Sequence, residues 1–149
     1  MRKSKGQYRI VSEILLFAAG LAIASFVAIT FNDLRDSISE ITKRDQMISI
    51  SNLISASLIK SIAENTTTRL RIPDLISDEV YIISFESSAG GACTIGNCLL
   101  RLRTVVSGIT VTQQLFNISQ SHIINGNVYS SARYIEIVSN GTVIRVDRS

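Results

Sequence analysis

The residues of this chain that could support catalysis are few and scattered. His122 is the only histidine, and it stands between Ser121 and Ile123. A general base or an activated nucleophile needs a second reactive group within hydrogen-bond range. The thiol of Cys93 or Cys98 would have to supply this second group, but a disulfide between the two cysteines is the better interpretation. The sequence therefore predicts a protein that is not an enzyme and has no catalytic residues.

The two cysteines lie in the run Gly90-Gly91-Ala92-Cys93-Thr94-Ile95-Gly96-Asn97-Cys98. A pair at this spacing in a glycine-rich loop suits a disulfide, provided that the compartment is oxidising. Free thiols are the alternative. A metal site is disfavoured because no histidine lies nearby.

Acidic residues cluster in one short region, which contains Asp74, Asp78, Glu79 and Glu86. Carboxylates of this kind bind calcium in some proteins, but a solvated turn explains them equally well. We expect no metal and no cofactor.

Three sequons for N-glycosylation follow one another along the second half of the chain. They are Asn65-Thr66-Thr67, Asn117-Ile118-Ser119 and Asn140-Gly141-Thr142. Asn140-Gly141 is also typical of a tight turn. Together with the topology argued below, the sequons favour a glycoprotein at the cell surface.

The element that organises the rest of the chain is a long apolar stretch near the amino terminus. The stretch Ile10 to Phe31 is apolar apart from a few polar residues, and Glu13 is its one charge. As a helix it would be roughly 33 Å long, enough to cross a hydrocarbon core of about 30 Å. A secretory signal peptide and a buried core helix are the alternatives. The first usually has a shorter apolar region, and the second needs a polar side.

The charge distribution indicates how this helix would lie in a membrane. Four of the 15 basic residues precede Glu13, and basic and acidic residues balance after Phe31. A basic flank stays on the cytoplasmic side, so the carboxy-terminal part is expected outside the cell. A neutral external domain offers no basic face for nucleic acid, and we expect no nucleic-acid partner.

Beyond the apolar stretch the helix is expected to continue as an amphipathic segment to the middle 60s. One apolar series is Leu34, Ile38, Ile41 and Ile48, and a second is Met47, Ile50, Ile54, Leu58 and Ile62. Neither glycine nor proline occurs from residue 21 to residue 72, which predicts one helix of roughly 55 residues. Its outer half must bury apolar side chains under its own sheet or against neighbouring helices.

After the helix the hydrophobic period changes to two. The predicted strands are Glu79 to Phe85, Leu99 to Val106, Ile109 to Leu115, Arg133 to Val138 and Thr142 to Asp147. Turns are expected at Ser107-Gly108 and Asn140-Gly141. The fold class is thus α+β: a long amino-terminal helix packed on a small antiparallel sheet, a meander of about five strands.

Two stretches near the amino terminus carry a family resemblance. Lys5-Gly6-Gln7 places a basic and a small residue just ahead of the apolar run, and Ser12-Glu13-Ile14-Leu15-Leu16-Phe17-Ala18-Ala19 opens the helix. Together they resemble the class III signal peptides and helices of the type IV pilin and archaellin superfamily, and the membrane segments of archaellar accessory proteins F and G. The resemblance implies cleavage of the Gly6–Gln7 bond by a prepilin-type signal peptidase, and it also implies the helix-on-sheet fold.

Glu13 departs from the family pattern, since it would be the seventh mature residue, whereas bacterial pilins usually carry glutamate at the fifth. Arg9 also stands where archaellins usually have glycine. In a filament Glu13 could neutralise the amino terminus of a neighbouring subunit. The alternatives are an ion pair with Arg9 one turn away, or a carboxylate that reaches the headgroups.

The sequence and the resemblance together divide the chain into four parts. We expect a leader at 1–6, a transmembrane and assembly helix at 7–31, its amphipathic continuation at 32–66 and an extracellular β domain at 67–149. The implied function is a structural subunit of a type IV pilus-type filament, in adhesion or a related surface role. Its partners would be the membrane, other copies of the chain and the filament assembly machinery. The alternative is a single-pass, non-polymerising binding module, or an accessory protein such as a minor pilin.

Overall fold

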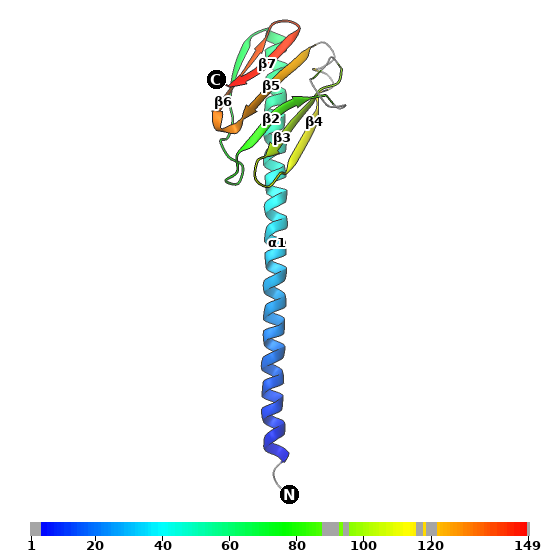
Figure 1. Cartoon of the computed structure of the whole chain (residues 1–149), viewed down its shortest axis with the longest axis vertical. Helices are drawn as coiled ribbons and strands as arrows, with labels where there is room; N and C mark the ends of the chain where they lie inside the picture. Colours follow the sequence, from blue (N-terminus) through cyan, green and yellow to red (C-terminus); the bar gives the residue numbers. More distant parts are fainter. Residues whose placement is uncertain (1–3, 88–92, 94–95, 116–117, 119–121, 149) are drawn as a thin grey trace. The chain divides into compact units, whose positions relative to one another are not determined.

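One long helix and one sheet account for most of the chain (Figure 1). The computed structural model describes residues 4–87, 93, 96–115, 118 and 122–148. Two compact units make up the chain, Met1–Glu40 and Ile41–Ser149. The described residues of the first unit, 4–40, are all helical. The second contains the rest of the helix packed on the sheet, so the predicted α+β class is confirmed.

The helix α1 runs from Ser4 to Glu64 without interruption, as the sequence predicted. The next residue, Asn65, has a φ of 47°, which lies in the left-handed region and ends the helix. The Asn65 N–H donates to the carbonyl of Ile62 at 3.3 Å, and the Thr66 N–H donates to that of Ser61 at 3.2 Å. This pattern satisfies the last free carbonyls of a helix and stops it at the predicted place.

Among the described residues the sheet has seven strands, so the prediction of about five was wrong. The strands are β1 (Thr67–Arg71), β2 (Tyr81–Glu86), β3 (Leu99–Thr104), β4 (Thr110–Gln114), β5 (Ile123–Tyr129), β6 (Tyr134–Ser139) and β7 (Val143–Arg148). Five of them coincide with the predicted ranges to within a few residues. The two additional strands, β1 and β5, were missed.

The predicted antiparallel meander was also wrong. The strand order is β1-β6-β7-β5-β2-β3-β4, and β5 pairs with β7 in parallel. After β5, the short 3-10 turn η1 (Ser130–Ala132) leads to β6, which leaves room for β7 beside β5. The two expected hairpins, β3–β4 and β6–β7, are present. Their turns use Gly108 and Gly141 at φ values of 68° and 87°.

The core lies between one face of the sheet and one face of α1. The helix contributes Met47, Ile50, Ile54 and Leu58, all buried. The opposing residues of the strands are those that the alternation predicted, including Leu100, Leu102, Ile135, Ile137, Ile144 and Val146. The helix and the sheet thus bury each other's apolar side.

Candidate functional site

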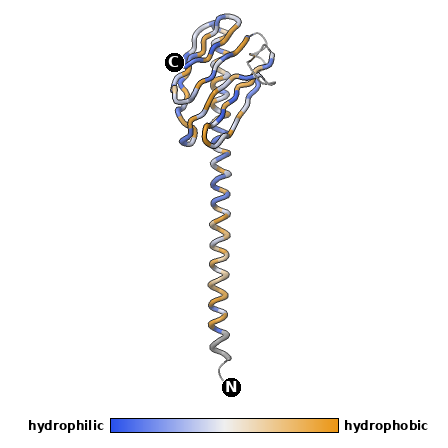
Figure 2. Tube along the Cα trace, viewed as in Figure 1, coloured by the Kyte–Doolittle hydropathy of each residue, from blue (hydrophilic) through white to orange (hydrophobic). Residues whose placement is uncertain are grey.

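The amino-terminal part of α1 is apolar and uncovered. Every side chain from Arg9 to Glu40 is exposed. The helix is long and apolar enough to cross a membrane, and none of its most apolar stretch is buried within the chain. Figure 2 shows how apolar residues predominate there. Soluble proteins rarely leave so large an apolar surface in water, so it is the first candidate for function.

The two apolar series of the amphipathic segment have different environments. Met47, Ile50, Ile54 and Leu58 are buried in the core, as described above. Leu34, Ile38, Ile41 and Ile48 are 53%, 55%, 59% and 47% exposed. The helix therefore covers its own sheet with one face and exposes the series Leu34, Ile38, Ile41 and Ile48, here called the outer stripe.

Glycine leaves a shallow hollow on the apolar part of the helix. The hollow is lined by Ser12, Glu13, Leu16, Phe17, Gly20 and Leu21, all from α1. A Cβ added at Gly20 would meet no atom within 4 Å. Since no contact among the described residues requires this glycine, the space is open to a side chain of another helix.

Glu13 forms an ion pair within its own helix. The Nε atom of Arg9 lies 3.4 Å from Oε1 of Glu13, and the side chains are 85% and 70% exposed. This is the i, i+4 pair that the sequence analysis held as an alternative to a contact between subunits. An exposed pair of this kind can exchange partners at little cost, so the role of Glu13 in assembly stays a prediction.

The proposed processing site lies at the start of α1. The backbone of Lys5, Gly6 and Gln7 is helical, and their side chains lie outside the described part of the structure. Cleavage of the Gly6–Gln7 bond therefore stays a prediction of the sequence resemblance.

Cys93 and Cys98 form a disulfide with a Cα–Cα distance of 4.9 Å, as predicted. Both residues are buried. Since the sequence contains only these two cysteines, no thiol is left to act as a nucleophile beside His122. The disulfide joins two residues that lie between β2 and β3 in the sequence.

Two of the three sequons can be placed. Asn65 is exposed at the end of α1, and Asn140 is exposed in the β6–β7 turn. The side-chain oxygen of Asn140 accepts a hydrogen bond from the Val143 N–H at 3.3 Å. Asn117 lies outside the described residues. Glycosylation at all three sites stays a prediction.

Three of the clustered carboxylates, Asp74, Glu79 and Glu86, form ion pairs with cations that are distant along the chain. Asp74 lies 2.8 Å from Arg133, and Glu86 lies 2.6 Å from Arg101. Among the described residues, no three histidine, cysteine or acidic side chains gather as metal ligands would. Local sequence patterns could not predict these pairs, because each joins residues that are distant along the chain.

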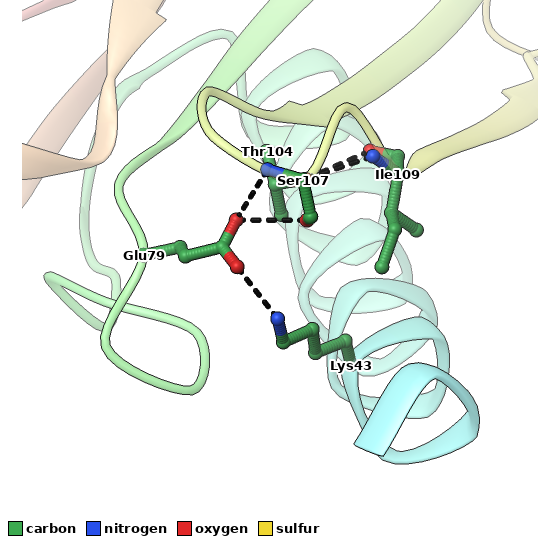
Figure 3. Close-up of polar contacts among 5 residues, drawn as sticks. All are labelled: Lys43, Glu79, Thr104, Ser107 and Ile109. Carbon is green, nitrogen blue, oxygen red and sulfur yellow. Dashed lines mark hydrogen bonds and ion pairs between the residues drawn. The ribbon is translucent and has the colours of Figure 1, made fainter. Parts of the chain in front are cut away.

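Glu79 forms one ion pair and accepts two further hydrogen bonds (Figure 3). Lys43 Nζ lies 2.6 Å from Glu79 Oε1, while the Ser107 N–H and hydroxyl donate to Oε2 at 2.9 and 2.8 Å. The Lys43 hydrogen bond, assisted by both bonds from Ser107, lowers the pKa of Glu79 from 4.5 to about 2. The site joins α1, the segment before β2 and the β3–β4 turn, which is a structural role.

No protein-family model, curated protein or solved structure matches this chain.

Proposed function

We propose that this chain is a pilin-like structural subunit of an extracellular type IV pilus-type filament, assembled through its amino-terminal helix. The supporting observation is that exposed apolar residues continue along α1 past the length that a membrane requires. Ile10 to Phe31 alone would span about 33 Å. The outer stripe begins after that point, and its four side chains are exposed.

A simple membrane anchor gives no reason for the outer stripe. Outside the hydrocarbon core, exposed leucine and isoleucine side chains would face water, at a cost of roughly 1.5–3 kcal/mol each relative to burial. Leu34, Ile41 and Ile48 recur every seven residues, with Ile38 four residues after Leu34. This is the spacing at which helices pack side by side, so helices of other copies are the natural cover.

In this proposal the chain first enters the membrane with its amino terminus in the cytoplasm and its β domain outside. A prepilin-type signal peptidase cleaves after Gly6, and the assembly machinery withdraws the helix from the lipid into a bundle. Glu13 then exchanges Arg9 for the amino terminus of a neighbouring subunit. The β domains form the outer surface, where adhesion or a related role would reside.

A non-polymerising membrane-anchored binding module or accessory protein is the second candidate. The intrahelical pair of Arg9 with Glu13 favours it, because Glu13 then needs no neighbouring subunit. This candidate predicts a membrane protein that is absent from sheared surface filaments.

The test is the behaviour of the full chain on its native cell surface. Sheared filaments should contain the protein with Gln7 at its amino terminus by mass spectrometry, and Gly6→Leu should abolish both cleavage and filaments. Ile41→Asp should lower the filament yield at least about tenfold by charging the outer stripe. Gln46→Asp adds the same charge at an exposed position on another face of the helix and should have little effect.

Abundant membrane-bound protein with an uncut amino terminus and no polymer would reject the filament and leave the anchored module. Equal yields from Ile41→Asp and Gln46→Asp would show that the outer stripe has no part in assembly.

A further inference from the structure

The sheet ends in two strands that, among the described residues, each pair on one side. β1 pairs with β6, and β4 pairs with β3. Both strands have five residues, which alternate between exposed and half-buried positions. The free backbone groups of an edge strand are a template for a further strand.

The hydrogen bonds at the ends of β4 show which backbone groups are free. The Thr104 N–H donates to the Ile109 carbonyl at 3.0 Å, and the Leu115 N–H donates to the Cys98 carbonyl at 3.0 Å. Antiparallel pairs alternate between residues that exchange two such bonds and residues that exchange none. The backbone groups of the three exposed residues of β4 therefore point to the open edge. These residues are Thr110, Thr112 and Gln114.

The same reasoning applies to β1. The Ile72 N–H donates to the Arg133 carbonyl at 2.9 Å, next to the paired residues Arg71 and Tyr134. The alternation directs the backbone groups of Thr67, Arg69 and Arg71 to the open edge. Within the part of the chain that the structure describes, each edge thus offers three residues with free backbone donors and acceptors.

The two edges differ in charge. β1 carries Arg69 and Arg71, and charged side chains keep an edge strand from pairing with its own kind. The β4 sequence, Thr-Val-Thr-Gln-Gln, contains neither a charge nor a proline. Two β1 edges would bring arginines together, whereas β4 offers hydroxyl and amide oxygens that accept hydrogen bonds from a guanidinium.

Strand direction makes the two edges complementary. Following the pairing across the sheet, β1, β7, β5 and β3 run in one direction, and β6, β2 and β4 run in the other. Two copies placed side by side in the same orientation would therefore bring β4 of one against β1 of the next in antiparallel fashion. Subunits of a filament share one polarity, so no copy would need to be reversed.

We propose that β4 of one copy pairs antiparallel with β1 of the next copy, so that the sheets of neighbouring subunits join edge to edge. This inference rests on the proposed filament. With Arg69 opposite Thr112, the seam would contain roughly six backbone hydrogen bonds. The same register places Leu70 opposite Val111, two half-buried apolar residues that border the core. Repetition of this unlike-edge contact gives an open chain of subunits.

Cysteine cross-linking of the assembled full chain tests the pairing. Both native cysteines are in a disulfide, so the only free thiol in Thr112→Cys or Arg69→Cys is the one introduced. Opposed residues of an antiparallel pair have Cα atoms about 5.5 Å apart, within the range of a disulfide. Oxidation of filaments that contain both variants should give dimers of one copy of each, and neither variant alone should cross-link.

The control is Asn127→Cys mixed with Arg69→Cys, because Asn127 is exposed on β5, which has a neighbour on each side. This mixture should give no dimer. A dimer from Thr112→Cys alone would indicate β4–β4 pairing and overturn the proposal.

A second pair of variants checks the pairing through the charge of Arg69. In the presence of Thr67→Cys subunits, adding Thr112→Lys to Gln114→Cys subunits should lower cross-linking at least about tenfold, because this register places Thr67 opposite Gln114 and the introduced lysine opposite Arg69, a like charge. Asn127→Lys in place of Thr112→Lys should not lower it. Filaments that form normally but never cross-link between these edges would overturn this inference while the proposed function stands. A chain that forms no filaments would defeat the proposed function itself.

Discussion

Lys43 of α1 and Glu79, in the segment before β2, form an ion pair with 2.6 Å between Nζ and Oε1, and their side chains are only 15% and 14% exposed. Glu79 also accepts two hydrogen bonds from Ser107 in the β3–β4 turn. The ion pair therefore anchors two loops to the helix at one point. The two residues are 36 positions apart in the sequence, so no local pattern predicts that they pair.

The Glu79 site predicts loss of stability in acid. The pKa of Glu79 in the folded protein is about 2, below the ordinary value of 4.5. The folded state therefore holds this carboxylate ionised more strongly than the unfolded state does. Its contribution is complete above pH 4.5 and disappears as the pH falls towards 2. Thermal melts of the full chain in detergent, followed by near-ultraviolet circular dichroism, measure this change.

Glu79→Gln isolates that contribution from the other carboxylates. The variant should melt below the wild type at pH 7, and the difference should shrink as the pH falls from 4.5 to 2. Asp147→Asn is the control, because Asp147 is exposed and lies 3.9 Å from Arg145. Exposed ion pairs contribute about 0–1 kcal/mol. A difference for Glu79→Gln that is unchanged down to pH 2 would contradict the assignment.

Gln113 predicts a second stabilising link between α1 and the sheet. Its Oε1 accepts hydrogen bonds from the hydroxyls of Ser51 and Ser55, and its Nε2 donates to Asn52. Gln113→Leu should destabilise the β domain by about 1–3 kcal/mol in urea unfolding, because the buried Ser51 hydroxyl loses its acceptor. The exposed neighbour Gln114 changed to leucine should cost less than about 0.5 kcal/mol.

A double-mutant cycle decides whether the link is direct. If Ser51 and Gln113 stabilise the protein together, Ser51→Ala combined with Gln113→Leu should cost less than the sum of the two single changes. Additive costs would show that each residue acts on its own.

The helix and the core were predictable because they depend on local periodicity. Met47, Ile50, Ile54 and Leu58 recur at helical spacing, and Leu100 and Leu102 alternate along a strand. Such patterns state which face is buried without stating what covers it. For that reason the sequence left open whether the outer stripe or the second series meets the sheet.

The strands β1 and β5 were not predicted, for a different reason. β1 has the single apolar residue Leu70, since an edge strand with one face exposed needs little more. β5 contains Asn125-Gly126-Asn127, which is typical of a turn, yet Gly126 lies in the strand interior because Val146 approaches closely there. The ion pairs of Glu79 and Asp74 could not be predicted from the sequence either, since they depend on tertiary contacts.

Adjacent residues of α1 differ in burial, so we expect their substitutions to have unequal effects on stability. Leu58 is fully buried, while Ile59 is 55% exposed. Leu58→Ala should lower the free energy of unfolding of the β domain by about 2–5 kcal/mol, the cost of a cavity in a packed core. Ile59→Ala should change it by less than about 0.5 kcal/mol. Urea unfolding of both variants measures the contrast, and similar costs would show that the helix face is assigned wrongly.

The parallel contact of β5 with β7 predicts that Gly126 tolerates no side chain. A Cβ at this position would lie 2.4 Å from the carbonyl oxygen of Val146 and 2.8 Å from its Cβ. Because the nearest atom belongs to the backbone of a paired strand, Gly126→Ala must push β5 and β7 apart, at a cost of about 1–3 kcal/mol. Gly20→Ala adds the same methyl group where nothing lies within 4 Å and should leave the unfolding of the β domain unchanged. Urea unfolding compares the two variants, and a Gly126→Ala protein as stable as the wild type would exclude the close parallel pairing of Gly126 with Val146.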